Sequence, residues 1–575
     1  MAAAPGRRRV SAVAVAVAAA VLAALALRVT LLGDRVFHWD EARVGYWILQ
    51  YQATGEWEYR AIVHGPFLFH VNEFLFGVFG RSDAVARVPV AVVGALLPAT
   101  AWLFRTRLDD VEVVSLAALL AVNPVLVYYS RFMRNDVLVA AFSLAALGLG
   151  VRALDTRRGG YLVAAGAFLG LAFTTKENAL VYVGMFVGAT ALLLDERLFT
   201  ARERASNWSS TLHGELRRTA RGAVAWRRAL AGGAVAFLAV VVVFYAPRPE
   251  FYAAFGEPTR LPGVLSAGTA GAWAEFWGTW GTAGSVSRDH SYIAFLTDAL
   301  RTLSAASLML VVAAVFGFLA ERYVADGPRD FVLFAGYWGV ASIVVYPAIT
   351  DISGHWSVVH AVVPLAIPAA VGLRLVVERG WSAFTDDDYL SVALAAIVLL
   401  AAAGQMGAVT AETSFLMPQD DDNELVQYGQ PASDMQDTLA NVERVAAANG
   451  GTDVLYYGDH FYAHGEPTGG EAVEPGDVSD TNWFHRLPLP WYTGRAGAAT
   501  DSTLKLTTGT ATGESQSPSV EDTDAPVVIT RAKHYTDVAE YLEPRGYESW
   551  TYELTSSNTV FVIFVDANAA GYDQQ

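Results

Sequence analysis

Long apolar runs constrain the fold of this 575-residue chain more strongly than any other feature of its sequence. They recur throughout residues 1–410, and most are long enough to cross a bilayer as a helix. The whole chain is 53% hydrophobic and only 17% charged, which is too apolar for an ordinary soluble protein. We therefore expect a polytopic α-helical membrane domain. About eleven spans are predicted, the fifth and sixth of them short: residues 10–32, 84–104, 112–129, 136–153, 160–174, 178–194, 229–247, 302–320, 331–349, 357–377 and 388–409.

The distribution of arginine predicts the orientation of these spans. Residues 7–9 are all arginine and precede the first span, which has no convincing cleavage site, so we expect a retained helix and a cytoplasmic N-terminus. The loop at 196–228 is rich in arginine and falls inside on this count. An odd number of spans then places residues 411–575 outside. The expected location is the cell membrane, with multiple passes and an extracytoplasmic C-terminal domain.

The C-terminal region, residues 411–575, differs from the rest of the chain in charge and in pattern. It contains 27 Asp and Glu against 7 Lys and Arg, although the whole chain has a net charge of −17. An acidic, lysine-poor surface is typical of proteins from high-salt environments, so we expect a halophilic source. The alternative is codon bias in a GC-rich genome, which replaces lysine by arginine. The pattern predicts a small α/β domain: helices at 435–450 and 537–547, strands at 453–459, 525–530, 549–555 and 559–566, a turn at 486–494 and a flexible loop at 500–524.

The first outer loop, residues 33–83, is far longer than a simple connection and carries the most unusual polar residues. Its tryptophans and tyrosines are residues that settle at a membrane boundary, so we expect helices along the interface. Asp40 and Glu41 stand where the first of these helices begins. Adjacent residues on a helix point about 100° apart, so one carboxylate should face a site and the other support it. The alternative is that Asp40 caps the helix and Glu41 is a solvated acid of its first turn.

The second outer turn, "YYSRFMRND", places Arg131, Arg134 and Asp136 at the same membrane level as Asp40. Two guanidinium groups beside the headgroup plane suit a phosphate, because their planar fork binds phosphate oxygens bidentately. An Arg134–Asp136 pair that closes a tight turn, or arginines that reach the interface without a ligand, would explain the same pattern. The third outer turn, "TTKEN", adds Lys176, for which an ion pair with the next residue is the alternative.

Two later outer loops contribute weaker candidates. The loop at 248–300 ends with Arg288 and His290, and the next outer turn holds His355 and His360. Interfacial anchoring or helix capping is the simpler explanation for each of them. His355 and His360 are five positions apart and do not share a helix face, so they are a poor pair of metal ligands.

Taken together, these residues and motifs resemble the class C glycosyltransferases. The resemblance rests on the long first loop with its Asp-Glu pair, on "LFGVFGRSDAVARVP" leading into the next span, and on the "YYSRFMRND" turn. It is closest to the branch of the protein O-mannosyltransferases and the lipid A aminoarabinose transferases. Within that branch the chain is most similar to an archaeal flippase-activity-associated group linked to N-glycosylation. The resemblance covers about residues 10–410 and is most specific in the first two outer loops.

The resemblance implies a transferase that uses a polyprenyl- or dolichyl-phosphate sugar at the outer face. By position it makes Asp40 the catalytic base, Glu41 its supporting acid and Asp136 the acid of the second loop. The candidate ligands of the donor phosphate are Arg131, Arg134 and Lys176. The candidate substrate-binding residues are His64, Arg288, His290 and His360. The usual His-Pro-Pro or Lys-Pro-Pro motif of the family reads His64-Gly65-Pro66 here, which is a departure from the pattern.

The residue types suit this chemistry independently of the resemblance. A glycosyl phosphate carries a good leaving group, so one base and some cations suffice. A divalent metal bound by Asp40, Glu41 or Asp136 is compatible with carboxylate chemistry, but the spacing does not require one. The acceptor is a glycan, a lipid or a protein, membrane lipid surrounds the chain, and nucleic acid is not an expected partner. The alternative is a non-catalytic flippase or flippase-associated protein for lipid-linked oligosaccharide. Few charges lie inside the predicted spans, and this disfavours a pathway across the bilayer. The main exception in an apolar stretch is Glu73, in the first outer loop.

Overall fold

The computed structural model describes residues 11–61, 64–203, 208–281, 290–325, 327–350, 352–463, 482–507, 518–555 and 559–573. Arg288, one of the predicted substrate-binding residues, lies outside these ranges.

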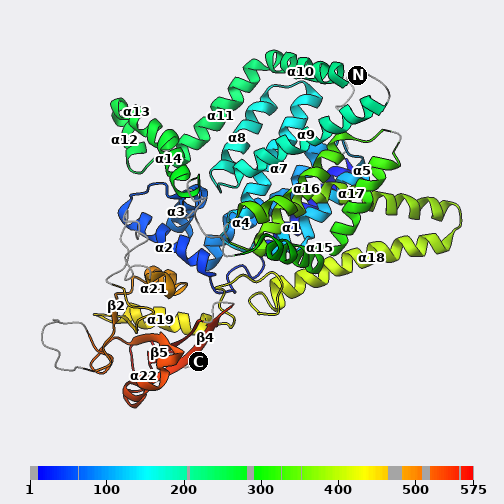
Figure 1. Cartoon of the computed structure of the whole chain (residues 1–575). Coiled ribbons are helices and arrows are strands. Elements are labelled where there is room, and N and C mark those ends of the chain that lie inside the picture. The colour runs from blue at the N-terminus through cyan, green and yellow to red at the C-terminus, as the bar shows by residue number, and fades with distance from the viewer. Residues whose placement is uncertain are drawn as a thin grey trace, which may run out of the picture.

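The membrane domain is a bundle of long apolar helices (Figure 1). Within the described ranges, nine helical segments are long and apolar enough to cross a membrane, and they coincide with nine of the predicted spans. They comprise α1 (Ala12–Val29), α4 (Asp83–Leu96) continued by η2 (Leu97–Phe104), α7 (Asp136–Thr156), α9 (Ala179–Glu203), α11 (Arg227–Tyr245), α15 (Tyr292–Tyr323), α16 (Asp330–Ile349), η7 (His355–Val358) continued by α17 (Val359–Thr385), and α18 (Tyr389–Ala411) with η8 (Glu412–Leu416). The polytopic helical class is therefore confirmed.

The other two predicted spans are shorter helices. One is α8 (Gly160–Phe173), with 14 residues. The other is divided into α5 (Asp110–Val122) and α6 (Pro124–Tyr129). The division falls at Asn123, whose side-chain oxygen accepts a hydrogen bond from the Leu126 amide at 3.3 Å, and the proline that follows has no amide hydrogen to continue the first helix. This break directs the chain into the turn that carries Arg131, Arg134 and Asp136.

The centre of the bundle is α17, which packs against α15, α16, α18 and α5. Its approach to α15 depends on two glycines. A Cβ atom on Gly317 would lie 2.0 Å from the Pro368 carbonyl oxygen, and one on Gly372 would lie 2.1 Å from that of Ala313. Small residues of this kind let membrane helices pack with their backbones in contact.

Short helices extend from the bundle on the side where α1 ends. The first outer loop forms α2 (Trp39–Thr54) and α3 (Phe67–Phe79), as the aromatic residues predicted. The later loop forms α12 (Glu250–Gly256), α13 (Leu261–Ser266) and α14 (Ala272–Phe276). The backbones of Trp57 and Arg248 exchange hydrogen bonds of 3.1 and 2.9 Å, which joins the two loops. The arginine-rich α10 (Trp208–Ala225) lies at the opposite end of the bundle (Figure 1).

The C-terminal domain is a five-stranded sheet with helices, and it lies beside α2 (Figure 1). Its strands are β1 (Val454–Tyr457), β2 (Thr500–Thr503), β3 (Val527–Arg531), β4 (Tyr547–Leu554) and β5 (Thr559–Asp566), in the order β2-β1-β3-β5-β4. β1 pairs in parallel with β2 and β3, whereas β5 pairs antiparallel with β3 and β4. The helices are α19 (Gln436–Ala448), α21 (Leu489–Ala496) and α22 (Tyr535–Leu542).

Two predictions for this domain were wrong in detail. Residues 500–503 were expected in a flexible loop but form the edge strand β2; the sequence "TDST" has no apolar alternation, and backbone pairing with β1 alone defines it. Residues 486–494 were expected to form a turn, and instead most of them belong to the helix α21, which packs against α2 and α19. Trp491 and Tyr492 of this helix donate hydrogen bonds to Asp83 at the start of α4, in the membrane domain.

Candidate active site

The capping of α2 sets the directions of Asp40 and Glu41. His38 is the N-cap: its Nδ1 accepts a hydrogen bond from the Asp40 amide at 3.0 Å, and its Nε2 donates to the Tyr428 carbonyl at 2.6 Å. The Glu41 carboxylate in turn accepts from the His38 amide at 3.0 Å, which completes a capping box. Burial, the largest influence, lowers the pKa of His38 to about 4, so its ring is neutral at neutral pH. The cap is therefore His38, and the alternative in which Asp40 only caps the helix was wrong.

Glu41 is completely buried and joins three parts of the chain. Its carboxylate accepts two hydrogen bonds of 2.8 Å from Arg87 on α4, one of 3.1 Å from Arg35, and one of 2.7 Å from the Met133 amide. Burial, the largest single influence, raises the pKa of Glu41, but the charges of Arg87 and Arg35 and the hydrogen bonds to the carboxylate together lower it by more, so the net pKa lies below its usual range. Glu41 is thus a buried anchor of α2 and not a solvated acid.

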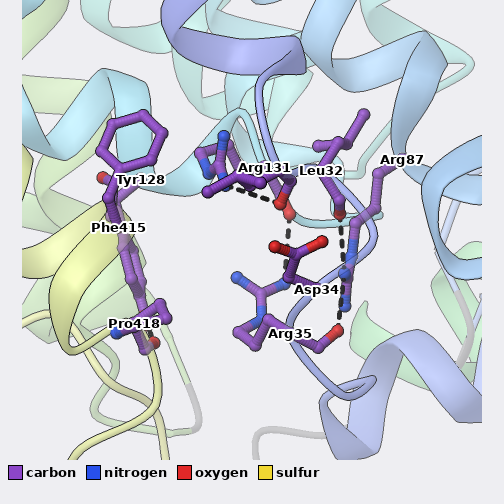
Figure 2. Close-up of a pocket in the computed structure, with 10 residues that line it drawn as sticks. Leu32, Asp34, Arg35, Arg87, Tyr128, Arg131, Phe415 and Pro418 are labelled. Carbon is purple, nitrogen blue, oxygen red and sulfur yellow. Dashed lines mark hydrogen bonds between the residues drawn. The ribbon is translucent and has the colours of Figure 1, made fainter. Parts of the chain in front are cut away.

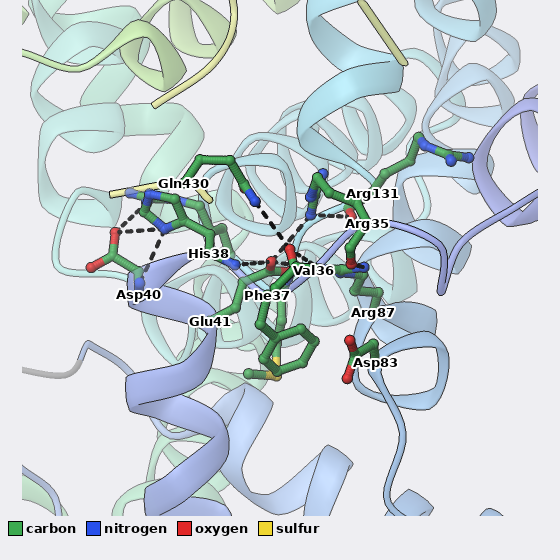
Figure 3. A network of polar contacts seen from close by, with 12 residues as sticks. Arg35, Val36, Phe37, His38, Asp40, Glu41, Asp83, Arg87, Arg131 and Gln430 are labelled. Atoms are coloured by element: carbon green, nitrogen blue, oxygen red, sulfur yellow. Dashed lines mark hydrogen bonds and ion pairs between the residues drawn. The ribbon is translucent and has the colours of Figure 1, made fainter. Parts of the chain in front are cut away.

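Asp40 points away from Glu41 (Figure 3) and keeps 28% of its side chain exposed. Its Oδ2 accepts a hydrogen bond from Nη1 of Arg134 in the second outer turn. Burial, the largest single influence, raises the pKa of Asp40, but the neighbouring positive groups, Arg134 first among them and Arg43 also, together outweigh it, so the net pKa lies below its usual range. The result is one ionised and partly exposed carboxylate at the start of an interfacial helix.

From Asp40 toward the interior of the protein, basic and acidic side chains alternate. Arg134 Nε lies 3.5 Å from Oδ2 of Asp136, and the Lys176 ammonium lies 2.8 Å from Oδ1 of the same carboxylate. His360 Nε2 lies 3.4 Å from that oxygen, while its Nδ1 is 2.8 Å from the Tyr182 hydroxyl. The structure therefore brings together four of the predicted residues with Asp40 at the exposed end. The simple Arg134–Asp136 pair considered as an alternative is present, but it is part of this larger series.

His64 lies in the turn before α3, in contact with the turn that carries Lys176. Its Nδ1 is 3.0 Å from the Glu177 carboxylate. Gly65 donates its amide hydrogen to the Thr175 carbonyl at 3.0 Å, and a Cβ atom on it would lie 2.3 Å from the Thr174 carbonyl oxygen. The departure from the usual proline at this position has a local reason, since only glycine allows the two backbones to approach this closely.

Two other predicted residues lie elsewhere. Arg131 donates to the carbonyls of Leu27 at 3.1 Å and Leu31 at 2.9 Å, at the end of α1, and lines a different cavity (Figure 2). His290 Nε2 bonds to the Thr350 carbonyl at 3.1 Å, at the ends of α15 and α16. Neither has a described hydrogen bond to Asp40 or Asp136.

Sequence reasoning did not select several residues that surround Asp40. Arg43 is three positions from Asp40, which places the two on one face of α2, and this spacing was the available signal. Its Nε is buried without a hydrogen-bond partner among the described residues, and its guanidinium lies 5.1 Å from the ring centroid of Phe484. Gln427 accepts from Arg134 at 2.7 Å, and the Trp356 ring lies 4.1 Å beneath the same guanidinium. Gln427 follows the last membrane helix, and nothing in the sequence relates it to Asp40.

The carboxylates do not form a metal centre as they stand. Among the described residues, no three His, Asp or Glu side chains are grouped to hold an ion. Arg134 lies between Asp40 and Asp136, and Lys176 pairs with the second of these. A divalent cation would have to displace these positive groups, so the residues do not fit one in this arrangement.

A bundle of membrane helices with an α/β domain beside it has counterparts among solved structures. The crystal structure of ArnT from Cupriavidus metallidurans in the apo state matches 98% of this chain and 100% of that chain, with a TM-score of 0.55 and 16% identity. The structure of the same protein bound to undecaprenyl phosphate matches 97% and 99%, with a TM-score of 0.52 and 17% identity. The archaeal oligosaccharyltransferase AglB from Archaeoglobus fulgidus matches 95% and 74%, with a TM-score of 0.46 and 15% identity.

Two families match separate segments of the chain. Residues 63–205 match the dolichyl-phosphate-mannose-protein mannosyltransferases, and residues 435–566 match the C-terminal domain of the Agl23 flippase-associated proteins. No curated protein matches the chain significantly. The chain therefore combines a mannosyltransferase-type membrane segment with an Agl23-type C-terminal domain, which confirms the resemblance drawn from the outer loops. Asp40 lies outside both matched segments.

Proposed function

We propose that this protein transfers a sugar from a polyprenyl- or dolichyl-phosphate donor to an acceptor at the outer face of the membrane, with Asp40 as the base. The observation that carries the proposal is the state of Asp40. It is partly exposed, it is kept ionised by neighbouring positive charge to which Arg134 contributes most, and its position is fixed by the buried Glu41 network. A carboxylate so placed can take a proton at neutral pH. The acceptor belongs to a glycan, a lipid or a protein.

In the proposed reaction, the acceptor oxygen forms a bond to the anomeric carbon while the bond from that carbon to the donor phosphate breaks. The acceptor proton passes to Asp40, and the lipid phosphate leaves with the bonding electrons. The leaving phosphate needs a cation, and Arg43 supports this role best, since it shares a helix face with Asp40 and forms no ion pair within the described residues. We assign Arg134 to holding Asp40 charged, and Asp136 and Lys176 to holding Arg134 in place.

The test is donor turnover by the purified protein in lipid nanodiscs, with radiolabelled dolichyl-phosphate mannose and a membrane extract as the acceptor source. Asp40→Asn keeps the shape of the side chain but cannot take the proton, so transfer should fall by about 100-fold or more. Glu56→Gln is the matched control, because Glu56 is an exposed acid of the same loop and should leave transfer unchanged. Unaltered transfer by Asp40→Asn, with Glu56→Gln also active, would overturn the assignment of the base.

The match of residues 435–566 to the Agl23 flippase-associated domain supports a second candidate, a non-catalytic role in moving lipid-linked oligosaccharide. Glycan profiles of cells separate the two functions. A deletion strain that carries the Asp40→Asn protein should lack the same sugar as the deletion itself if the protein is a transferase. Complete rescue by Asp40→Asn would favour the flippase-associated role.

The proposed site faces outward, together with α2 and the C-terminal domain. Since the chain contains no cysteine, single cysteines can report this orientation directly. A cysteine at Asp34, before α2, should react with a membrane-impermeant maleimide in intact cells, whereas one at Arg221 on α10 should react only after lysis. The reverse pattern would place Asp40 in the cytoplasm and remove the basis of the proposal.

A further inference from the structure

A cavity lies at the end of α1, where the chain turns toward α2. It has a volume of about 40 Å³. Arginines line one side, and apolar residues of the segment after α18 line the other (Figure 2). The lining residues used below are Arg35, Arg87, Arg131, Ser414 and Phe415. Asp40 points away from this region, on the far side of Glu41 (Figure 3), so the cavity is separate from the proposed catalytic site.

The cavity has more buried positive charge than the protein neutralises. Arg35 and Arg87 share the carboxylate of Glu41, while Arg131 forms no ion pair with any described carboxylate. The one carboxylate in the lining, that of Asp34, is exposed to solvent, whereas the three arginines are at least nine-tenths buried. Burial and the like charge of Arg87 lower the pKa of Arg35 to about 10, which still leaves it charged at neutral pH. Buried charges without partners are costly, so this excess favours an anion.

Two buried polar groups at the cavity lack partners. Arg35 Nε and Ser414 Oγ have no hydrogen-bond partner among the described residues, and Ser414 is only 1% exposed. The Arg131 guanidinium is fixed beside them by the carbonyls at the end of α1. Because buried polar groups are almost always satisfied, these donors point to a missing acceptor. The volume fits roughly three water molecules, or one tetrahedral oxyanion.

We propose that this cavity binds a phosphate group, with Arg35, Arg131 and Ser414 as its donors. The phosphate comes either from an anionic membrane lipid or from free phosphate. The apolar wall formed by Phe415 and Pro418 suits an attached acyl chain (Figure 2). The bound anion stabilises the contact between the end of α1 and η8, the segment that leads from α18 into the C-terminal domain. This site requires no catalytic step, and it stands whether or not the proposed function is correct.

The experiment uses the full-length protein, delipidated in detergent. One arm measures the unfolding temperature with inorganic phosphate against chloride at equal ionic strength. The other arm measures the retention of phosphatidylglycerol against phosphatidylcholine by native mass spectrometry. We expect saturable binding of one ligand in one of the two measurements. The measurement that responds shows whether the bound phosphate is free phosphate or the headgroup of a lipid. Arg35→Gln and Ser414→Val should each weaken binding by about tenfold or more, since each removes a hydrogen bond to a charged group.

Arg301→Gln is the matched control, because Arg301 is 71% exposed, pairs with Glu424 and lies outside the cavity. It should bind as the unmodified protein does. Ser414→Val keeps the volume nearly constant, so it separates lost binding from lost folding if Arg35→Gln does not fold. Equal binding by Ser414→Val and the unmodified protein, or no response in either arm, would overturn the proposal. Neither measurement depends on transfer activity. Loss of phosphate binding would therefore not contradict the proposed function, and loss of transfer would not contradict this site.

Discussion

Glu41 and Asp40 are neighbours in the sequence, but their surroundings are opposite. Glu41 is surrounded by donors, whereas Asp40 has one ion pair with Arg134 and an exposed edge. We expect Glu41→Gln to destabilise the protein by about 3–5 kcal/mol, because it leaves Arg87 and Arg35 buried without their countercharge. The measurement is thermal unfolding in detergent. Asp40→Asn is the comparison, and its unfolding temperature should change far less; equal losses would contradict the division of roles.

Arg134 controls the protonation of Asp40. In the unmodified protein the Asp40 pKa lies below its usual value, so Asp40 stays ionised well into the acidic range. Arg134→Gln removes the largest of the charges that offset burial, so the pKa of Asp40 rises. The acidic limb of the pH–rate profile should therefore move to higher pH. An unchanged limb, with only the maximal rate reduced, would show that Arg134 does not act through Asp40.

At the level of elements, α4 and α21 are joined by one carboxylate. Asp83 accepts hydrogen bonds from the Trp491 indole and the Tyr492 hydroxyl, both at 2.8 Å, and from Arg495. Asp83→Asn should cost about 2–3 kcal/mol, since it removes a buried charge that Arg495 needs. It should also speed proteolysis of the C-terminal domain. Glu443→Gln removes the other, more exposed partner of Arg495 and should have a smaller effect on both measurements.

The turn before α3 offers a second test between elements. A Cβ atom on Gly65 would lie 2.3 Å from the Thr174 carbonyl oxygen, so Gly65→Ala should force the two turns apart and cost about 1–3 kcal/mol. The control is Gly77→Ala in α3, where nothing lies within 4 Å of the added atom. It should be neutral or slightly stabilising. Equal unfolding temperatures for the two variants would show that the two turns can move apart without loss of stability.

Hydropathy predicted the helical elements well, because membrane spans follow from local composition alone. It did not predict the division at Asn123, where a cap and a proline interrupt an apolar run. The charged residues of the site were recognisable at the ends of spans, but their partners were not. Lys176 is 40 positions from Asp136, and no local pattern says which acid it meets. Arg131 was expected to act beside Asp40, and only the three-dimensional structure shows it at the end of α1.

At the scale of the whole molecule, charge is strongly uneven. Residues 411–575 carry 27 acidic against 7 basic side chains, and their repulsion is reduced by salt. The unfolding temperature should therefore rise between about 0.1 M and about 2 M potassium chloride. Replacing both Asp421 and Asp422, two exposed acids, with asparagine should reduce this dependence. A fall in stability with salt would contradict the expectation of a protein adapted to high salt.

Gln427 and Tyr428 follow the last membrane helix, yet they contact Arg134 and His38 beside an acid that follows the first. The surroundings of Asp40 are thus completed by residues that lie beyond the last membrane helix. A chain that stops between residues 416 and 427 would contain every membrane span of the described structure and lack the groups that contact Arg134 and His38. We expect such a truncated chain to insert into the membrane and yet to be inactive.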